Sequence, residues 1–292
     1  MKKKLLISGL LLAGIVCIGL VAKSFYDLGY TRGRNSLFAQ KESTVEEKSV
    51  NSKKIRIPLF LDPKNVKHRT RFLFTYDPPE SLEEFNNTYK LKTIAGNTDE
   101  FHRILNIMKW VRNLWEPSTP KIYPPVNAMV IIDAIKSGKT GGFCAQYNYV
   151  FVQALQSLGI KARYVTLEGH EVTEVFINDF NKWILFDPSY ALVIKDNQNY
   201  LSVYEIFAKV RQGKQDELKV EPYISRILQE NREMYFNKYK IFAVWIKNDH
   251  SSSPVNFTDI NRYRVYYIES YDDFFKVPFG TLFTFYKEDL YL

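Results

Sequence analysis

The chain has 292 residues, of which 46% are hydrophobic and 25% are charged. This composition excludes an intrinsically disordered protein, and the length suits one large domain or two modest ones. The formal net charge is +8, but lysines and arginines are interspersed with acids and no signature of a nucleic-acid module occurs, so we expect no nucleic-acid partner. Envelope polyanions and anionic lipid headgroups are compatible with this charge.

The first 23 residues predict a membrane anchor. Three lysines precede the uncharged stretch Leu5–Ala22, which as a helix would be about 27 Å long, close to the roughly 30 Å hydrocarbon core of a bilayer. Because small-x-small cleavage patterns are poor, we favour an uncleaved signal anchor over a removed signal peptide. By the positive-inside rule, we then expect a single-pass protein of the cytoplasmic membrane whose folded part is extracytoplasmic.

A polar segment separates this anchor from the folded body. Residues 24–54 have little periodic apolar content and predict a stalk. Short strands are expected at Ile55–Phe60 and Thr70–Tyr76, where the body begins.

Helical patterns follow. Between Asn97 and Trp115, apolar residues recur at spacings of three and four and predict a helix, with Asn97 and Glu100 as its capping pair. A shorter helix is expected over Ala128–Lys136, with Asn127 as its cap.

A third helix is expected to begin at Cys144 and to end at Gly159. The pattern then changes to period two, which predicts strands at Arg163–Leu167, Glu171–Ile177 and Lys182–Phe186. A helix packed against an antiparallel sheet, and hence an α+β fold, is the simplest interpretation.

The last part of the chain carries two helical patterns and three aromatic, strand-like patterns. They are Val203–Arg211, Tyr223–Phe236, Ile241–Ile246, Tyr263–Ile268 and Thr281–Tyr286. We take residues 55–204 as the core domain. Residues 205–292 either extend the same sheet or form a small companion domain, and the sequence leaves both open.

Cys144 is the candidate nucleophile. Cys17, the other cysteine, lies in the predicted anchor, so Cys144 has no partner for an intramolecular disulfide. A helix N-terminus favours the thiolate, and its free N–H groups could donate to an oxyanion during acyl transfer. Gly141 and Gly142 are expected to let the chain turn sharply just before the sulfur.

His170 and Asp187 are candidates for the base and for the group that orients it. In a hairpin closed by residues 178–181, Ile177 faces Lys182, and Asp187 then faces Val172. Asp187 would therefore be a diagonal neighbour of His170 on the same side of the sheet, within reach of a hydrogen bond. A connection one residue longer or shorter would send Asp187 to the opposite face.

Three blocks of sequence resemble the bacterial transglutaminase-like proteins of the papain-like superfamily. They are Gly141–Cys144, with the helix that leads to Val165, then Gly169–Val175, and Trp183–Ser189. The resemblance covers about Asn97 to Tyr190 and implies a transglutaminase-core fold.

The implied roles are nucleophile for Cys144, base for His170 and orienting acid for Asp187. Glu174 matches the family's acidic residue four positions after the histidine, with no catalytic role assigned. Val172 departs from the family, since many members carry an aromatic residue there. The family includes crosslinking enzymes, peptidases, amidases and inactive members, so the resemblance does not fix the reaction.

Other motifs favour structural roles. His68, His102 and His250 have no ligand-like spacing with cysteines or acids, so we expect no metal site and no cofactor. Trp110 and Trp115 are expected to pack in the core. The loop before Cys144 lacks the glycine spacing of a phosphate-binding loop.

The sequence therefore predicts thiol-dependent acyl transfer on amide bonds, of peptidase, amidase or transglutaminase type. The substrate would be a peptide or protein amide, and a cell-envelope component is the other partner considered. The alternative hypothesis is an inactive transglutaminase-like binding or assembly module of the envelope, in which Cys144 is merely a small buried hydrophobe. A third hypothesis is a binder of anionic polymers, which would associate in a strongly salt-dependent way.

Overall fold

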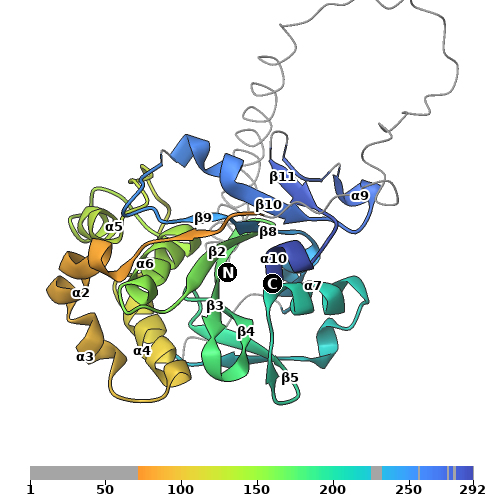
Figure 1. Ribbon diagram of the computed structural model, residues 1–292, viewed down its shortest axis with the longest axis horizontal. Coiled ribbons are helices and arrows are strands. Elements are labelled where there is room, and N and C mark those ends of the chain that lie inside the picture. Colours follow the sequence, from red (N-terminus) through yellow and green to blue (C-terminus); the bar gives the residue numbers. More distant parts are fainter. Residues whose placement is uncertain (1–71, 225–231, 256, 275, 279–280, 292) are drawn as a thin grey trace, which may run out of the picture. The chain divides into compact units, whose positions relative to one another are not determined.

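The computed structural model describes residues 72–292, apart from 225–231, 256, 275, 279–280 and 292 (Figure 1). The predicted anchor, the stalk and the strand predicted over Ile55–Phe60 lie outside the described residues. In the described part of the chain, no helix is both long enough and apolar enough to cross a bilayer.

The described chain has an α+β fold in which helices pack on a mostly antiparallel sheet. Figure 1 shows the first helices gathered on one side of that sheet. These are η2 (Pro79–Leu82), α2 (Glu83–Tyr89), α3 (Leu91–Ala95), α4 (Glu100–Arg112), α5 (Ala128–Lys136) and α6 (Cys144–Gln156). Helices α4 and α5 both pack against α6, which in turn lies on the sheet.

Helices α4 and α5 begin at side-chain caps, and one of the two caps corrects the sequence prediction. The N-cap of α4 is Asp99, whose carboxylate accepts a hydrogen bond from the His102 N–H, and not Asn97. The reason is that α3 ends at Gly96 with a φ of 78°, and the chain then uses Asn97 in the turn before it re-enters a helix. The prediction for α5 is confirmed, with Asn127 as its cap.

The main sheet has six strands in the order β11-β10-β8-β2-β3-β4. Their bounds are β2 Ala162–Leu167, β3 His170–Ile177, β4 Lys182–Phe186, β8 Phe242–Trp245, β10 Arg264–Tyr267 and β11 Leu282–Thr284. Among the described strands of this sheet, only β10 and β11 pair in parallel. The C-terminal strands therefore extend the sheet that carries β2 to β4.

The hairpin of β3 and β4 has the predicted register. Ile177 pairs with Lys182 and Thr173 pairs with Phe186. The connection is the 3-10 turn η3 (Asn178–Phe180) followed by Asn181 in a left-handed conformation with a φ of 48°. Strand β3 therefore presents alternate side chains to its two faces as expected.

The two faces of the sheet bury separate cores. Val175 and Phe186 lie in the core beneath α6, whereas Val172 and Leu185 lie in the core on the opposite face. The opposite face is covered by α7 (Val203–Arg211), α8 (Arg232–Asn237) and η5 (Lys238–Lys240). Val172, the position of departure from the family pattern, is thus a fully buried core residue.

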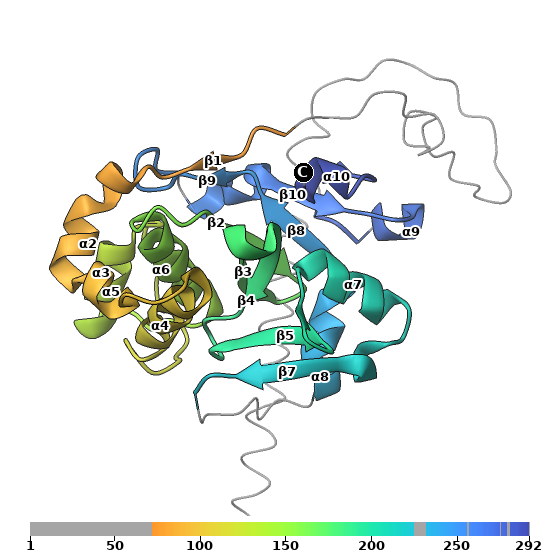
Figure 2. The same ribbon diagram turned by 60° about the horizontal axis from the view of Figure 1, so that its bottom comes forward.

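A smaller sheet lies beside the main one. It contains β5 (Leu192–Asp196), β6 (Asn199–Tyr200) and β7 (Leu218–Pro222), and Figure 2 shows β5 and β7 side by side below β4, near α8. The helix predicted over Tyr223–Phe236 is confirmed in part, because Arg232–Phe236 are helical in α8. Tyr223 and Ile224 are not helical, since the Tyr223 N–H donates to the Ala191 carbonyl at 2.8 Å, beside the start of β5, and residues 225–231 lie outside the described ranges.

Short elements complete the described chain. They are β1 (Thr75–Tyr76), β9 (Lys247–Asn248), η4 (Gln215–Glu217), η6 (Phe257–Tyr263), α9 (Tyr271–Phe274) and α10 (Glu288–Tyr291). Strands β1 and β9 form a parallel pair, so the described start of the chain joins the segment that follows β8.

A buried ion pair joins the C-terminal end to the sheet and accounts for Glu174. The Arg163 Nη2 lies 2.7 Å from the Glu174 Oε2, and both side chains are fully buried. Glu174 also accepts hydrogen bonds from the Val203 N–H and the Tyr291 hydroxyl, and Arg163 donates to the Leu290 carbonyl. Glu174 thus holds α7 and α10 against the sheet.

Candidate active site

Cys144 is the first residue of α6 and is partly exposed. The N-cap residue, Phe143, provides no side-chain acceptor for the first turn. Its own N–H donates to the Gln146 Oε1 at 3.2 Å. The first-turn N–H groups are therefore not capped by the residue before them, and their partial positive charge favours an anion at the sulfur.

The two glycines before Cys144 are required for space. Neither lies in a turn or a bend of the chain, and neither has a positive φ, which corrects the expectation that they make a sharp turn. A Cβ on Gly141 would lie 2.5 Å from the Thr119 carbonyl oxygen, and one on Gly142 would collide with Ile135 and Trp115. The loop at Thr119, Trp115 and Ile135 approach the backbone of residues 141–142 so closely that only glycine fits at these two positions.

Trp115 locks this approach in place. Its indole N–H donates to the Gly142 carbonyl at 3.2 Å, and its ring stacks on Tyr147 of α6 with centroids 4.6 Å apart. The Ser118 N–H donates to the same carbonyl at 3.0 Å. Trp115 therefore packs in the core, as predicted, and also fixes the backbone that enters α6.

His170 is the first residue of β3 and is brought to the end of the sheet by a tight turn. Leu167 pairs with His170 across the turn, in which Gly169 has a φ of 67°. The His170 Nε2 lies 2.7 Å from the Asp187 Oδ2. This bond leaves Nδ1 as the ring nitrogen available to Cys144, whose thiol lies close enough to act on the pKa of His170.

Asp187 is fully buried and receives three hydrogen-bond donors. Its Oδ2 accepts from His170 and from the Tyr235 hydroxyl at 2.9 Å, and its Oδ1 accepts from the Ser189 N–H at 3.0 Å. The β3–β4 ladder ends at the Thr173–Phe186 pair, and the backbone of Asp187 bonds instead to Leu192. The predicted hydrogen bond between the two side chains is present.

The electrostatics favour a charged His170. Burial opposes the charged imidazolium, but the charge of Asp187, its hydrogen bond and the neighbouring Cys144 outweigh burial and raise the pKa of His170 from 6.5 to about 10. An imidazolium beside Cys144 stabilises a thiolate.

Asn148, which the sequence interpretation missed, connects α6 to β3. Its Nδ2 donates to the Cys144 carbonyl at 2.8 Å and to the Glu171 carbonyl at 2.6 Å, and its Oδ1 accepts from the Thr173 hydroxyl at 2.6 Å. The helix of Cys144 is thereby fixed against the strand of His170. The available signal was a polar residue on the buried side of a helix, four positions after Cys144.

Aromatic side chains surround the histidine, and the sequence interpretation also missed these. The ring centroid of His170 lies 5.7 Å from that of Tyr190 and 6.2 Å from that of Tyr235. Tyr235 belongs to α8, in the C-terminal third. No local pattern relates it to His170, because the two meet only through the packing of α8 on the sheet.

The remaining histidines do not join this site. His102 is exposed on α4 and bonds to Asp99, and His68 lies outside the described residues. His250 is buried against Tyr164 and Trp245, and burial lowers its pKa to about 4. Within the described ranges, no group of three His, Cys, Asp or Glu side chains is placed to hold a metal ion.

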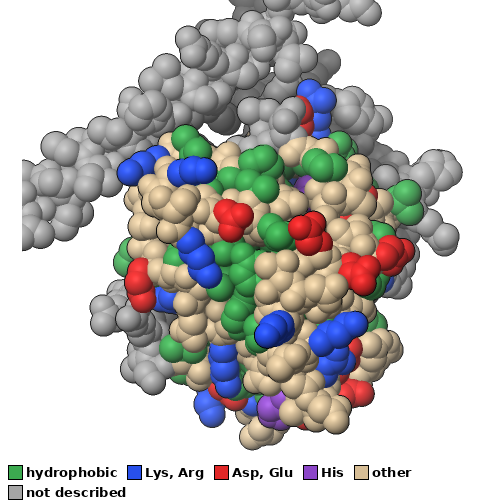
Figure 3. Space-filling view, turned by 90° about the vertical axis from the view of Figure 1, so that its left-hand side faces the viewer, with side chains coloured by type: hydrophobic (Ala, Val, Ile, Leu, Met, Phe, Trp, Pro, Cys, Tyr) green, Lys and Arg blue, Asp and Glu red, His purple; other side chains and the backbone are tan. Residues whose placement is uncertain are grey.

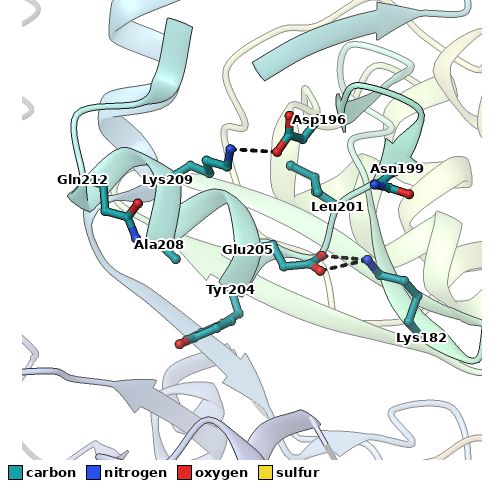
Figure 4. Close-up of a pocket in the computed structure, with 9 residues that line it drawn as sticks. All are labelled: Lys182, Asp196, Asn199, Leu201, Tyr204, Glu205, Ala208, Lys209 and Gln212. Carbon is teal, nitrogen blue, oxygen red and sulfur yellow. Dashed lines mark hydrogen bonds and ion pairs between the residues drawn. The ribbon is translucent and has the colours of Figure 1, made fainter. Parts of the chain in front are cut away.

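A separate pocket lies between α7 and the β5–β6 hairpin (Figure 4). Its lining residues are Lys182, Asp196, Asn199, Leu201, Tyr204, Glu205, Ala208, Lys209 and Gln212. Lys182 pairs with Glu205 at 2.9 Å and Lys209 pairs with Asp196 at 2.7 Å. The charges in the pocket thus neutralise one another, and neither Cys144 nor His170 lines it.

The helix-on-sheet fold is consistent with a transglutaminase core. Residues 87–188, about a third of the chain, match the model of the Transglutaminase-like superfamily and form a domain of that superfamily. Its members are usually cysteine-dependent hydrolases or acyltransferases.

Similarity to solved structures is partial. A crystal structure from Cytophaga hutchinsonii, described as that of a putative cysteine protease, is 22% identical to the chain, with a TM-score of 0.29. The match covers 46% of this chain and 45% of the Cytophaga protein, so this chain spans less than half of the length of the Cytophaga protein. No curated protein matches the chain significantly.

Proposed function

We propose that this protein performs thiol-dependent acyl transfer on amide bonds, with Cys144 as nucleophile, His170 as general acid and base, and Asp187 as the group that orients His170. The observation that carries the proposal is the position of His170, which bonds to buried Asp187 through Nε2 and lies close enough to partly exposed Cys144 for the thiol to act on its pKa.

The proposed first half-reaction acylates Cys144. The thiolate attacks the amide carbonyl and a C–S bond forms, while the first-turn N–H groups of α6 lie where they can donate to the oxyanion. The C–N bond then breaks, and the leaving amine takes a proton from the His170 imidazolium. A thioester on Cys144 and a neutral imidazole result.

The second half-reaction restores the enzyme. Water or a second amine attacks the thioester and passes a proton to His170 as the C–S bond breaks. Cys144 leaves as thiolate beside the imidazolium, so protons and charges balance over the cycle. The product is a carboxylic acid if water attacks and a new amide if an amine attacks.

The proposed location is the outer side of the cytoplasmic membrane, with the domain held by the N-terminal anchor. Support comes from the uncharged stretch Leu5–Ala22 behind three lysines.

The charge distribution gives little support to the anionic-polymer hypothesis. On the face in Figure 3, lysines and arginines stand among acidic and hydrophobic side chains.

An activated ester tests the proposal without knowledge of the natural substrate. The full chain with Cys17→Ser, purified in detergent, would be mixed with p-nitrophenyl acetate and followed by intact mass. We expect an acetyl group on Cys144 that is then lost to water or to an added primary amine. His170→Ala should slow acetylation by roughly 100-fold or more.

The matched control is His102→Ala, which removes an exposed histidine on α4 and should leave the acetylation rate unchanged. An absence of acetylation, or equal rates with and without His170, would contradict the proposal and favour the inactive binding module.

A further inference from the structure

Two buried tyrosines form a hydroxyl chain that ends on Asp187. The Tyr235 hydroxyl lies 2.9 Å from the Asp187 Oδ2 and 3.0 Å from the Tyr239 hydroxyl. Both tyrosines are fully buried. Burial raises the pKa of each phenol well above 10, so both keep their protons and can donate.

The direction of this chain follows from the chemistry of its end. A carboxylate can only accept hydrogen bonds, so Tyr235 must donate its proton to Asp187. The Tyr235 oxygen is then free to accept, and Tyr239 must be the donor between the two hydroxyls. The chain therefore runs from Tyr239 through Tyr235 to Asp187, and each bond polarises the next.

The same carboxylate oxygen also accepts the bond from His170. Oδ2 thus has two donors, the His170 Nε2 and the Tyr235 hydroxyl, whereas Oδ1 is held by the Ser189 N–H. Two consequences follow. The carboxylate cannot rotate without breaking a bond, and the negative charge at Oδ2 is shared between two donors instead of resting on His170 alone.

We propose that Tyr235 is a positioning residue, which fixes Oδ2 of Asp187 toward His170 and limits how tightly that oxygen holds the proton of the imidazolium. The inference rests on the proposed function and extends it beyond the domain matched at residues 87–188. If so, α8 in the C-terminal third contributes to the active site, because it supplies the Tyr235 hydroxyl that bonds to Asp187.

When one of two donors to the same carboxylate oxygen is removed, the hydrogen bond from the remaining donor becomes stronger. In Tyr235→Phe the His170–Asp187 bond should therefore tighten, and the NMR resonance of the proton on the His170 Nε2 should move downfield at neutral pH. A tighter bond at Nε2 also stabilises the imidazolium as a whole, so the proton on Nδ1, which faces Cys144, becomes a poorer acid toward the leaving group. Acetylation of Cys144 by p-nitroacetanilide, whose nitrogen must take that proton in order to leave, should therefore slow by roughly 3- to 10-fold.

Two further variants make the test graded. Tyr239→Phe keeps the Tyr235–Asp187 bond but weakens Tyr235 as a donor, so we expect a smaller downfield shift in the same direction. Tyr164→Phe is the matched control, because Tyr164 is equally buried but packs in the core beneath α6. It should leave the His170 resonance in place.

Loss of packing alone predicts the opposite signature. A loosened site would move the resonance upfield, or abolish it through exchange with water, and either result, or an unmoved resonance, would overturn the inference. The experiment also distinguishes failure of this inference from failure of the proposed function. A downfield shift without any acetylation of Cys144 would support the positioning role of Tyr235 and contradict the proposed enzymatic function. Normal acetylation with no shift would support the enzymatic function and contradict the positioning role.

Discussion

His170 is the residue whose charge links the site to the stability of the fold. Its pKa is raised from 6.5 to about 10 in the folded chain, although burial alone would lower it. A raised folded-state pKa stabilises the protein fully below the unfolded value, and this stabilisation is lost as the pH rises through the folded value. The pH window is therefore about 6.5 to 10.

We expect the free energy of unfolding to fall across this window by up to about 1.4 kcal/mol per pH unit. Because Asp187 supplies the opposing charge, Asp187→Asn should largely abolish the part of this fall in unfolding free energy that comes from His170. Chemical denaturation of the unmodified protein and of the variant at pH 6.5, 8 and 9.5 would measure the unfolding free energies. Parallel pH profiles for the two proteins would show that His170 is not held as an imidazolium.

Among single residues, the sequence located the three candidate side chains but not their partners. Cys144, His170 and Asp187 each stand in a recognisable local pattern. Asn148 and Tyr235 do not, since their roles arise from contacts between segments that local patterns do not relate. Glu174 matched the family pattern, and only its buried contact with Arg163 explains it.

At the scale of elements, the approach to α6 depends on a contact that excludes any side chain at Gly142. Gly142→Ala would force Ile135 and Trp115 to move, at a cost of roughly 1–3 kcal/mol in stability. Because the Gly142 carbonyl accepts the Trp115 indole bond, the backbone before Cys144 should shift as well. We expect slower acetylation of Cys144 together with lower thermal stability.

A matched control lies in the same loop. Gly138 has a φ of 73° and open space around it, and asparagine tolerates that conformation. Gly138→Asn should therefore preserve both stability and acetylation rate. If Gly142→Ala behaved like this control, the close packing against Trp115 would not be what positions Cys144.

The helices and hairpins with strong local patterns were predictable. The β3–β4 register could be predicted because turn length and alternation together fix which side chains face each other. The cap of α4 was misplaced by two residues, since Asn97 and Asp99 are both good caps and only the end of α3 at Gly96 decides between them. The helix predicted from Tyr223 is helical over Arg232–Phe236, but its start was wrong because the Tyr223 N–H bonds to the Ala191 carbonyl.

For the molecule as a whole, the C-terminal third is joined to the sheet that carries the site. Strands β8, β10 and β11 extend that sheet, α8 supplies Tyr235, and Glu174 holds α7 and α10. Sequence patterns could not choose between an extension and a companion domain, because strand order is a property of distant pairings. The anchor and the stalk stay predictions.

The central claim is that Cys144 and His170 form a reactive pair. Its most direct test is the pH dependence of Cys144 alkylation by iodoacetamide in the full chain with Cys17→Ser, with and without His170→Ala, followed by intact mass. We predict that alkylation of Cys144 stays fast when the pH is lowered from 8.5 to 6.5, and that His170→Ala makes the rate fall steeply over the same range. An unreactive Cys144, or the same dependence on pH with and without His170, would contradict the claim.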